Sequence, residues 1–215
     1  MKITHHPGAE SLMSCSAGSM PEALAAVMAS HMSICPECRN DLALMEHIGV
    51  ALFDQLSPSN LTEAAPIMAL RRSEADTAPA QAASAGDGDV PEPLVPLVGR
   101  YLDGVPWKKL VPGIWIHDIP LSSKGKGDLR LIKVAPGQAL SQHSHNGSEL
   151  TLVLRGACKD ATGHYKVGDV ADLSEDTEHQ PVSDPTEGCV CLIATEGKLR
   201  FKSIVARLLQ PLTGM

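Results

Sequence analysis

The chain has 215 residues, of which 43% are hydrophobic, and a net charge of −7. This length allows two small domains, and the hydrophobic fraction is that of a globular protein. No apolar run approaches the roughly 18 residues of a membrane span, and the N-terminus lacks the apolar stretch of a signal peptide, so we expect a cytoplasmic protein. Six cysteines in a reducing compartment indicate metal or redox chemistry rather than a disulfide framework.

The charge is unevenly distributed along the chain. Residues 1–93 carry four basic and twelve acidic side chains, whereas residues 94–215 carry fourteen basic and thirteen acidic ones. An acidic first part disfavours direct nucleic-acid binding, and it favours a basic protein as the partner.

Residues 1–75 are expected to form a small helical module. Ser19 and Glu22 have the spacing of a capping box, which predicts the start of a helix. A further helix is expected to begin at Pro36 and a shorter one around residues 66–73. The helix behind the capping box has an apolar face formed by residues at helical spacing, namely Leu24, Val27, Met28 and His31.

A first set of metal ligands lies where two of these helices meet. His31 is expected in the last turn of one helix, and Cys35 and Cys38 at the start of the next, where backbone amides stabilise thiolates. Tetrahedral zinc takes four nitrogen or sulfur ligands, so the spacing predicts a structural zinc site. His5 or His6 supplies the fourth ligand, and we choose His6 because it is closer to the first helix. A redox Cys-x-x-Cys is the alternative, but it requires a βαβ context that is missing here.

The early histidine followed by His31-x3-Cys35-x2-Cys38 resembles the zinc-binding anti-sigma domain over about the first third of the chain. The resemblance implies a helical bundle that wraps an extracytoplasmic-function sigma factor and covers the surfaces which that factor uses for RNA polymerase. Cys15 stands where an aromatic residue is common in that family. The candidate contacts to the sigma factor are Ile67, Met68 and Leu70.

A flexible linker is expected over residues 76–93, because this segment is rich in Ala, Pro, Gly, Asp and Ser and has no apolar period. Over residues 94–215 the pattern changes to short strands broken by Gly, Pro or Asp, which indicates a sandwich or barrel. The expected strands are Ile114–Ile119, Leu129–Val134, Glu149–Arg155, Asp169–Leu173 and Cys189–Ala194, with a closing helix or strand at Val205–Leu209.

A second set of metal ligands lies in this β region. His143 and His145 are two residues apart, so on a strand their side chains face the same side. The Asn-Gly pair that follows predicts a tight turn, which returns Glu149 to their side. The spacing Gly-x5-His-x-His-x3-Glu-x6-Gly resembles the first cupin motif, and His179, from a degraded second motif, is the best fourth ligand. Three nitrogens and a carboxylate suit zinc, but also manganese, iron or nickel.

Cys189 and Cys191 alternate on an expected strand, so their side chains face the same side. If that side is the barrel interior, both thiols lie near the metal and are open to oxidation. The alternative is that they are small buried hydrophobic residues. Cys15 and Cys158 are expected to be ordinary apolar positions.

An anti-sigma domain, a linker and a cupin in tandem resemble the ChrR-type cupin anti-sigma factors over almost the whole chain. The resemblance implies an all-α bundle followed by an all-β cupin barrel. It also implies a 1:1 complex in which the bundle inhibits the sigma factor, and a cupin that is needed for release by singlet oxygen, organic hydroperoxides or related oxidants. The implied zinc ligands are His6, His31, Cys35 and Cys38 for one ion, and His143, His145, Glu149 and His179 for a second.

Two other functions remain open at this point. One is a metal-dependent cupin enzyme, such as a dioxygenase or isomerase, in which the helical module serves for docking. The other is a metal sensor that binds the sigma factor only when zinc is abundant.

Overall fold

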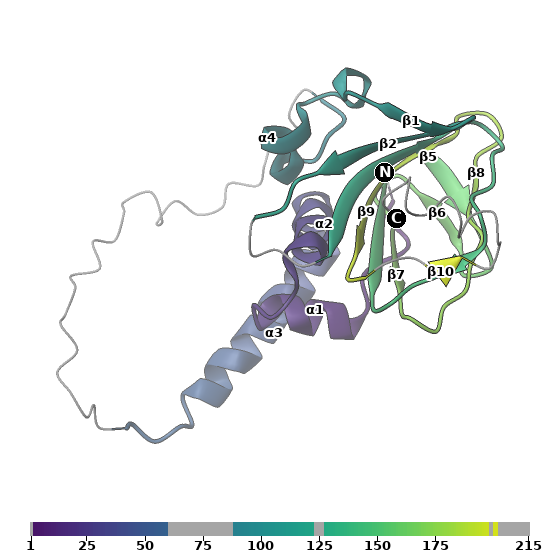
Figure 1. The fold of residues 1–215 in the computed structure, drawn as a ribbon. Helices are drawn as coiled ribbons and strands as arrows, with labels where there is room; N and C mark the ends of the chain where they lie inside the picture. Colours follow the sequence, from purple (N-terminus) through teal and green to yellow (C-terminus); the bar gives the residue numbers. More distant parts are fainter. Residues whose placement is uncertain (1, 60–87, 123–126, 198–199, 202–215) are drawn as a thin grey trace.

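The computed structural model describes residues 2–59, 88–122, 127–197 and 200–201, which form a helical module followed by a β module (Figure 1). The helical module contains α1 (Ala9–Ser16), α2 (Glu22–Ile34) and α3 (Pro36–Phe53). The expected order of an all-α bundle and then an all-β region is confirmed. The β module contains η2 (Glu92–Leu94), α4 (Val95–Val98), η3 (Leu102–Gly104), β1 (Lys108–Val111), β2 (Ile114–Ile119), β3 (Asp128–Val134), β4 (His143–Ser144), β5 (Glu149–Lys159), β6 (His164–Lys166), β7 (Val170–Leu173), β8 (Val182–Ser183), β9 (Cys189–Thr195) and β10 (Arg200–Phe201).

The strands pair antiparallel, in the order β1-β2-β3-β9-β5-β6. Strand β5 is the longest, and it changes partners along its length. Its first half pairs with β7, and its second half pairs with β6 and β8. The change of partners curves the sheet, and the inward-facing side chains of several strands line one cavity.

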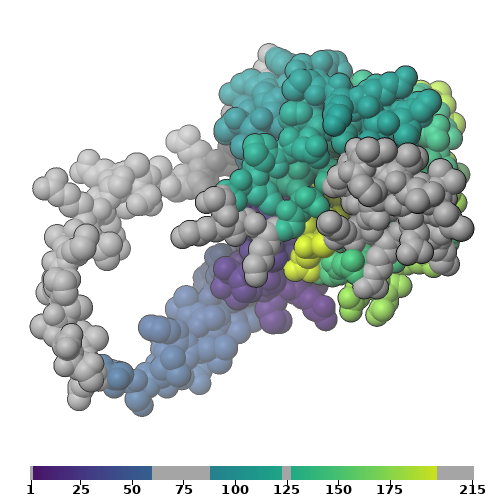
Figure 2. All heavy atoms as spheres, in the orientation of Figure 1, coloured from purple at the N-terminus to yellow at the C-terminus, as the bar shows by residue number. Residues whose placement is uncertain are grey.

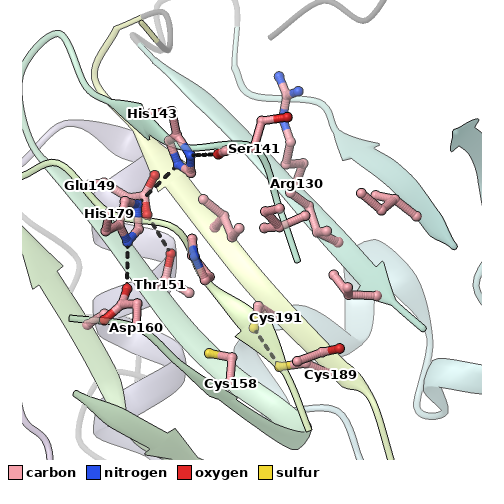
Figure 3. A pocket seen from close by; sticks show the side chains of 18 of the residues that line it. Arg130, Ser141, His143, Glu149, Thr151, Cys158, Asp160, His179, Cys189 and Cys191 are labelled. Carbon is pink, nitrogen blue, oxygen red and sulfur yellow. Dashed lines mark hydrogen bonds and ion pairs between the residues drawn. The ribbon is translucent and has the colours of Figure 1, made fainter. Parts of the chain in front are cut away.

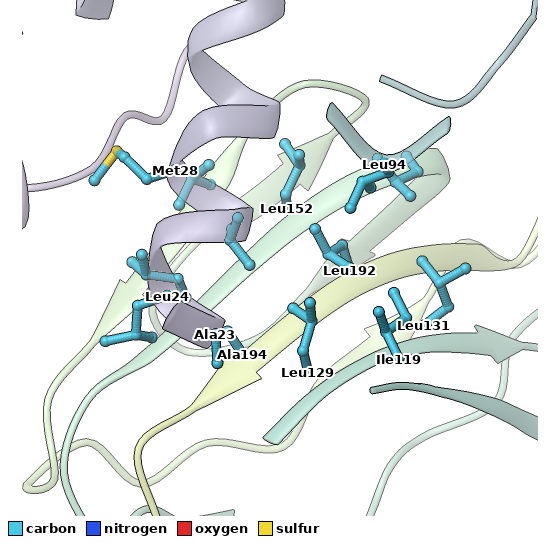
Figure 4. Close-up of a cluster of buried hydrophobic side chains, with 14 of the residues drawn as sticks. Ala23, Leu24, Met28, Leu94, Ile119, Leu129, Leu131, Leu152, Leu192 and Ala194 are labelled. Atoms are coloured by element: carbon cyan, nitrogen blue, oxygen red, sulfur yellow. The ribbon is translucent and has the colours of Figure 1, made fainter. Parts of the chain in front are cut away.

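Helix α2 covers the outer face of this sheet, where Ala23 and Met28 pack on leucines of β3, β5 and β9 (Figure 4). Side chains alternate between the two faces of β5. Leu150 and Leu152 face α2, whereas Glu149 faces the cavity. Each fully buried Leu or Met contributes about 1.5–3 kcal/mol relative to an exposed one. The two modules are therefore joined by a shared apolar core.

Residues 88–93, the end of the expected linker, pack on the β module. Val90 is buried, and the Asp89 carboxylate accepts a hydrogen bond of 2.8 Å from the backbone N–H of Leu102. Composition alone does not reveal these contacts, because they come from residues further along the chain. Residues 76–87 lie outside the described part of the structure.

The expected capping box is wrong. Helix α2 begins after Pro21 and has no side-chain cap. The Ser19 hydroxyl instead donates to the Ser14 carbonyl oxygen at the end of α1. The Glu22 carboxylate accepts two hydrogen bonds from Ser122 of the β module, from its backbone N–H at 2.8 Å and from its hydroxyl at 2.6 Å. Glu22 therefore forms a contact between the two modules instead of the expected local capping contact with Ser19.

The expected strands all appear, as β2, β3, β5, β7 and β9, with ends that differ by a few residues. The short strands β1, β4, β6 and β8 were not predicted, because segments of two to four residues carry little alternation. The expected helix at residues 66–73, the segment Val205–Leu209 and the candidate contacts Ile67, Met68 and Leu70 lie outside the described residues. Within the described part of the chain, no helix is both long enough and apolar enough to cross a membrane.

Candidate metal centres

The first ligand set is brought together by three segments of the helical module. His6 precedes α1, His31 lies in the last turn of α2, and Cys35 and Cys38 lie at the start of α3. Their donor atoms all lie within 4.8 Å of one another. The Cys38 sulfur is 3.2 Å from His6 Nδ1 and 3.3 Å from His31 Nε2. We call these four residues the helical cluster.

His5 lies apart from the helical cluster. Its Nδ1 is 3.2 Å from a carboxylate oxygen of Asp169, and its ring lies 4.6 Å from that of Tyr165. The sequence hardly distinguishes His5 from His6 as the fourth ligand. In the structure His6 lies beside the sulfurs, whereas His5 contacts the β module.

Burial sets the protonation of the helical cluster. It lowers the pKa of His31 to about 4, so this imidazole is neutral at pH 7. Burial, followed by the neighbouring Cys35 thiol, raises the pKa of Cys38 to about 12. The His31 Nδ1–H donates to the Gly168 carbonyl oxygen at 3.0 Å, which leaves Nε2 free to bind a cation. Two imidazoles and two thiols that release their protons to a metal fit a structural zinc ion.

The second ligand set lies inside the β module, and we call it the barrel cluster; Figure 3 labels three of its residues, His143, Glu149 and His179. His179 Nε2 is 3.1 Å from His143 Nε2 and 3.2 Å from His145 Nε2, and His145 Nδ1 is 3.0 Å from a Glu149 oxygen. All four side chains are buried. The turn before β5 has Gly147 at a φ of 90°, a region that glycine favours, and it returns the chain to the histidines.

Hydrogen bonds outside the barrel cluster orient its histidines. His143 Nδ1–H donates to the Ser141 carbonyl oxygen, and His179 Nδ1–H donates to Asp160, each at 2.7 Å. Burial alone would raise the pKa of Asp160, but hydrogen bonds from His179 and Thr162 lower it to about 2. An ionised carboxylate can only accept, so the His179 proton must be on Nδ1. The Nε2 lone pairs of both histidines can then bind a metal ion within the cluster.

Glu149 supplies the negative charge of the barrel cluster. Its burial would raise the pKa of the carboxyl, but the hydrogen bond from His145 and the charges of the histidines outweigh burial, and the pKa is lowered. Thr151 also donates to the carboxylate at 3.0 Å. Three imidazole nitrogens and one carboxylate fit zinc or another divalent transition metal.

The sulfurs of Cys158, Cys189 and Cys191 also lie within 4.8 Å of one another, and we call them the thiol cluster. Cys189 and Cys191 line the interior cavity and are also buried in an apolar cluster, so both expectations for their position are met. Hydrogen bonds from Cys189 and then Cys191 lower the pKa of Cys158, and the pKa values of the other two thiols are raised. Cys158 packs on the same apolar cluster, as expected for an apolar position, but the register between β5 and β9, which the sequence does not reveal, also brings its sulfur to the other two.

A cavity of about 190 Å³ connects the two interior clusters. It is lined by His143, Glu149 and His179 of the barrel cluster and by the whole thiol cluster (Figure 3). A small molecule that enters this space meets both the candidate metal ligands and the thiols.

Asp169 joins the β module to the segment that carries the first histidine ligand. The carboxylate is buried, and it accepts hydrogen bonds from the backbone N–H groups of Thr4 at 2.7 Å, His5 at 3.1 Å and Lys166 at 2.9 Å. The Val170 N–H donates in turn to the His5 carbonyl oxygen at 3.1 Å. Sequence patterns miss this role, because an acidic residue beside a strand gives no signal of a contact more than 160 residues away.

Comparisons with known proteins extend over both modules. Residues 100–198 match the model of the family described as the ChrR cupin-like domain. The chain is 38% identical to anti-sigma-E factor ChrR of Cereibacter sphaeroides over 214 residues, which cover 98% of each protein. It also matches a chain of the crystal structure of Rhodobacter sphaeroides SigE in complex with the anti-sigma ChrR, with a TM-score of 0.72 and 34% identity, covering 90% of this chain and 100% of that one. An acetylacetone dioxygenase from Acinetobacter johnsonii is a more distant match, with a TM-score of 0.41 and 14% identity over 46% of this chain and 73% of the other.

Proposed function

Because the chain belongs to the ChrR family of anti-sigma factors, we propose that it binds an extracytoplasmic-function sigma factor in a 1:1 complex and keeps it from RNA polymerase. Oxidants such as singlet oxygen or organic hydroperoxides release the factor. The observation that carries the proposal is a likeness that spans the helical module and the β module together, to a protein solved in complex with SigE. The complex forms in the cytoplasm, where sigma factors act.

The end of α3 offers a surface for this partner. The helix extends beyond the body of the molecule (Figures 1 and 2), and Cys38 is its one fully buried residue among those described. A large exposed apolar patch on a monomer indicates a protein interface. Acidic side chains on the same helix suit a basic partner. The exposed apolar residues are Leu44, Ile48, Val50, Leu52, Phe53 and Leu56. Ile67, Met68 and Leu70, further along the chain, stay predicted contacts.

Two metal ions per chain complete the proposed protein. Zinc in the helical cluster, bound by His6, His31, Cys35 and Cys38, would hold the N-terminal segment, α2 and α3 together. Zinc or another divalent metal in the barrel cluster, bound by His143, His145, Glu149 and His179, would supply a Lewis-acidic centre beside the thiols. The donor types and their convergence support both assignments.

The sensing element is proposed to be the barrel cluster together with Cys189 and Cys191. Oxidation of either thiol, or loss of the metal, changes the packing of the cavity that they share. Such a signal acts only if the bound and released states differ in their affinity for the sigma factor.

Contacts between the modules give the signal a route that avoids the linker. From His179, hydrogen bonds lead to Asp160 and then to Thr162, whose hydroxyl lies 2.9 Å from that of Tyr165. The Tyr165 ring contacts His5, next to the histidine of the helical cluster. His31 of that cluster also bonds directly to the β6–β7 turn. A structural change at the barrel cluster can therefore reach the helical cluster through a few side-chain contacts.

The alternative of a metal-dependent cupin enzyme has less support. The relative that covers 98% of the chain is an anti-sigma factor, which is a regulatory protein. We therefore assign no catalytic residues. Titrating metal against formation of the sigma-factor complex distinguishes a sensor of zinc supply from a sensor of oxidants.

The direct experiment is co-purification of the chain with the extracytoplasmic-function sigma factors of its own cell. We expect a 1:1 complex that blocks transcription by RNA polymerase carrying that factor. Ile48→Ser with Phe53→Ser should weaken the complex at least about tenfold, since both remove exposed apolar contacts from α3. Leu97→Ser is the matched control, because Leu97 is an exposed leucine of the β module. Failure to co-elute with any such sigma factor would refute the proposal.

A further inference from the structure

Three cysteine sulfurs meet inside the β module, outside both four-ligand clusters (Figure 3). Cys189 and Cys191 alternate along β9 and face inward, and Cys158 comes from the second half of β5. The sulfurs of Cys189 and Cys191 lie 3.2 Å apart, and all three lie within 4.8 Å of one another. They form a soft donor set that neither metal cluster uses.

The spacing suits a shared central atom better than a disulfide. Bonds of about 2.3 Å to a central atom hold sulfurs about 3.8 Å apart, within the separations found here. A disulfide between Cys189 and Cys191 would join Cα atoms about 6.5–7 Å apart, at the outer limit for that bond. Cys158 is a diagonal neighbour of Cys189, because Gly156 pairs with Cys189, and diagonal Cα atoms lie about 7–8 Å apart. Binding one atom therefore requires less backbone movement than oxidising any pair.

The surroundings of the thiol cluster favour a neutral ligand. Cys189 and Cys191 belong to an apolar cluster with Val153, Ala171 and Leu173. Three thiolates around a divalent cation would leave a net negative charge there, which is costly in an apolar interior. Three thiolates around trivalent arsenic leave none, and arsenous acid is itself small and neutral. The adjoining cavity of about 190 Å³ admits it, since a water molecule occupies about 30 Å³.

We propose that Cys158, Cys189 and Cys191 form a binding site for trivalent arsenic, which enters as arsenous acid. Each of its three As–O bonds is replaced by an As–S bond. Each hydroxide leaves as water, with a proton from the thiol or from solvent. Arsenic stays trivalent and no sulfur is oxidised, so the exchange needs neither oxidant nor reductant. The site does not depend on the identity of the protein partner.

The test is intact-mass spectrometry of the zinc-loaded full chain, reduced with a thiol-free phosphine and titrated with arsenite. We expect one arsenic per chain with the loss of three hydrogens, the mass of a three-thiol adduct. Cys158→Ser leaves two thiols, so its adduct should keep one hydroxyl on arsenic and form about tenfold more weakly. Cys15→Ser is the matched control, because Cys15 is a half-buried thiol outside the cluster, and it should bind like the unmodified chain.

X-ray absorption at the arsenic edge on the unmodified chain makes the test independent of how the variants fold. Three sulfur neighbours and no oxygen support the site, whereas two sulfurs and one oxygen overturn it. Equal binding by the unmodified chain and Cys158→Ser also overturns it. So does release of zinc in proportion to arsenic bound, which would assign the arsenic to Cys35 and Cys38. None of these outcomes bears on sigma-factor binding.

Discussion

The helical cluster and the barrel cluster use similar ligands in opposite structural settings. In the helical module, the ligands connect the N-terminal segment, α2 and α3, and most of α3 is exposed. In the β module, the ligands project from strands and turns already fixed by backbone hydrogen bonds, including those between His143 and His179. The first metal would therefore hold a fold together, whereas the second would occupy a cavity that the fold has already built.

The largest expected effect comes from breaking the helical cluster. His31→Ala or Cys35→Ser should remove the zinc, and the module should lose most of its helical circular dichroism, because structural zinc contributes about 10–16 kcal/mol in small zinc-binding peptides. Sigma-factor binding should be lost with it. His164→Ala is the control, since His164 is exposed on β6, away from α3. Full helicity in metal-free protein would contradict this view of the cluster.

The barrel cluster should behave differently when it is broken. Glu149→Ala should reduce the metal content from two ions per chain to one, because it removes the only carboxylate of the cluster. The strands and basal inhibition should persist, while release of the sigma factor by organic hydroperoxide should change. Metal analysis and a binding assay with and without oxidant measure both effects. Glu175→Ala, at an exposed acidic position, is the control. Unchanged induction would remove the barrel metal from the mechanism.

Local pattern was enough to predict the main strands and to predict that His31, Cys35 and Cys38 lie together, as do His143, His145 and Glu149. One helix junction and one turn bring these residues together, and neighbouring residues determine both. Contacts between distant segments were not predictable in this way. Glu22 matches a capping box, yet it bonds to Ser122 a hundred residues away. Cys158 joins the thiol cluster only through the register of β5 against β9.

A smaller effect should come from Asp169→Asn, which weakens the contact between the β module and the N-terminal segment of the helical module. Asp169 is a buried, ionised acceptor of three backbone N–H groups, and losing its charge costs about 1–3 kcal/mol. Burial would raise the pKa of Asp169, but hydrogen bonds from Thr4, Lys166 and His5 lower it. Its contribution to stability is therefore complete above the unfolded pKa of 3.8 and is lost as the pH falls through the lowered value.

Urea denaturation as a function of pH tests this interface. The unmodified chain should lose part of its free energy of unfolding below about pH 4, and Asp169→Asn should lack that part of the acid dependence. Identical pH profiles for the two proteins would mean that the Asp169 charge does not hold the modules together.

The smallest effect should come from Glu22→Ala. The carboxylate of Glu22 is exposed, so water replaces its bonds to Ser122 when the side chain is removed. Binding of the sigma factor and its release by oxidant should both match the unmodified chain. A change in release by oxidant in Glu22→Ala would instead mean that this exposed contact transmits the signal.

The hydrogen bond from His31 to Gly168 has a consequence for genetics. Its acceptor is a main-chain carbonyl, so no change of side chain at position 168 removes it directly. Gly168 has a φ of 90°, however, and any other residue there strains the turn and redirects that carbonyl. A selection for alleles that no longer respond to stress should therefore recover substitutions at Gly168, a codon outside both histidine-rich motifs.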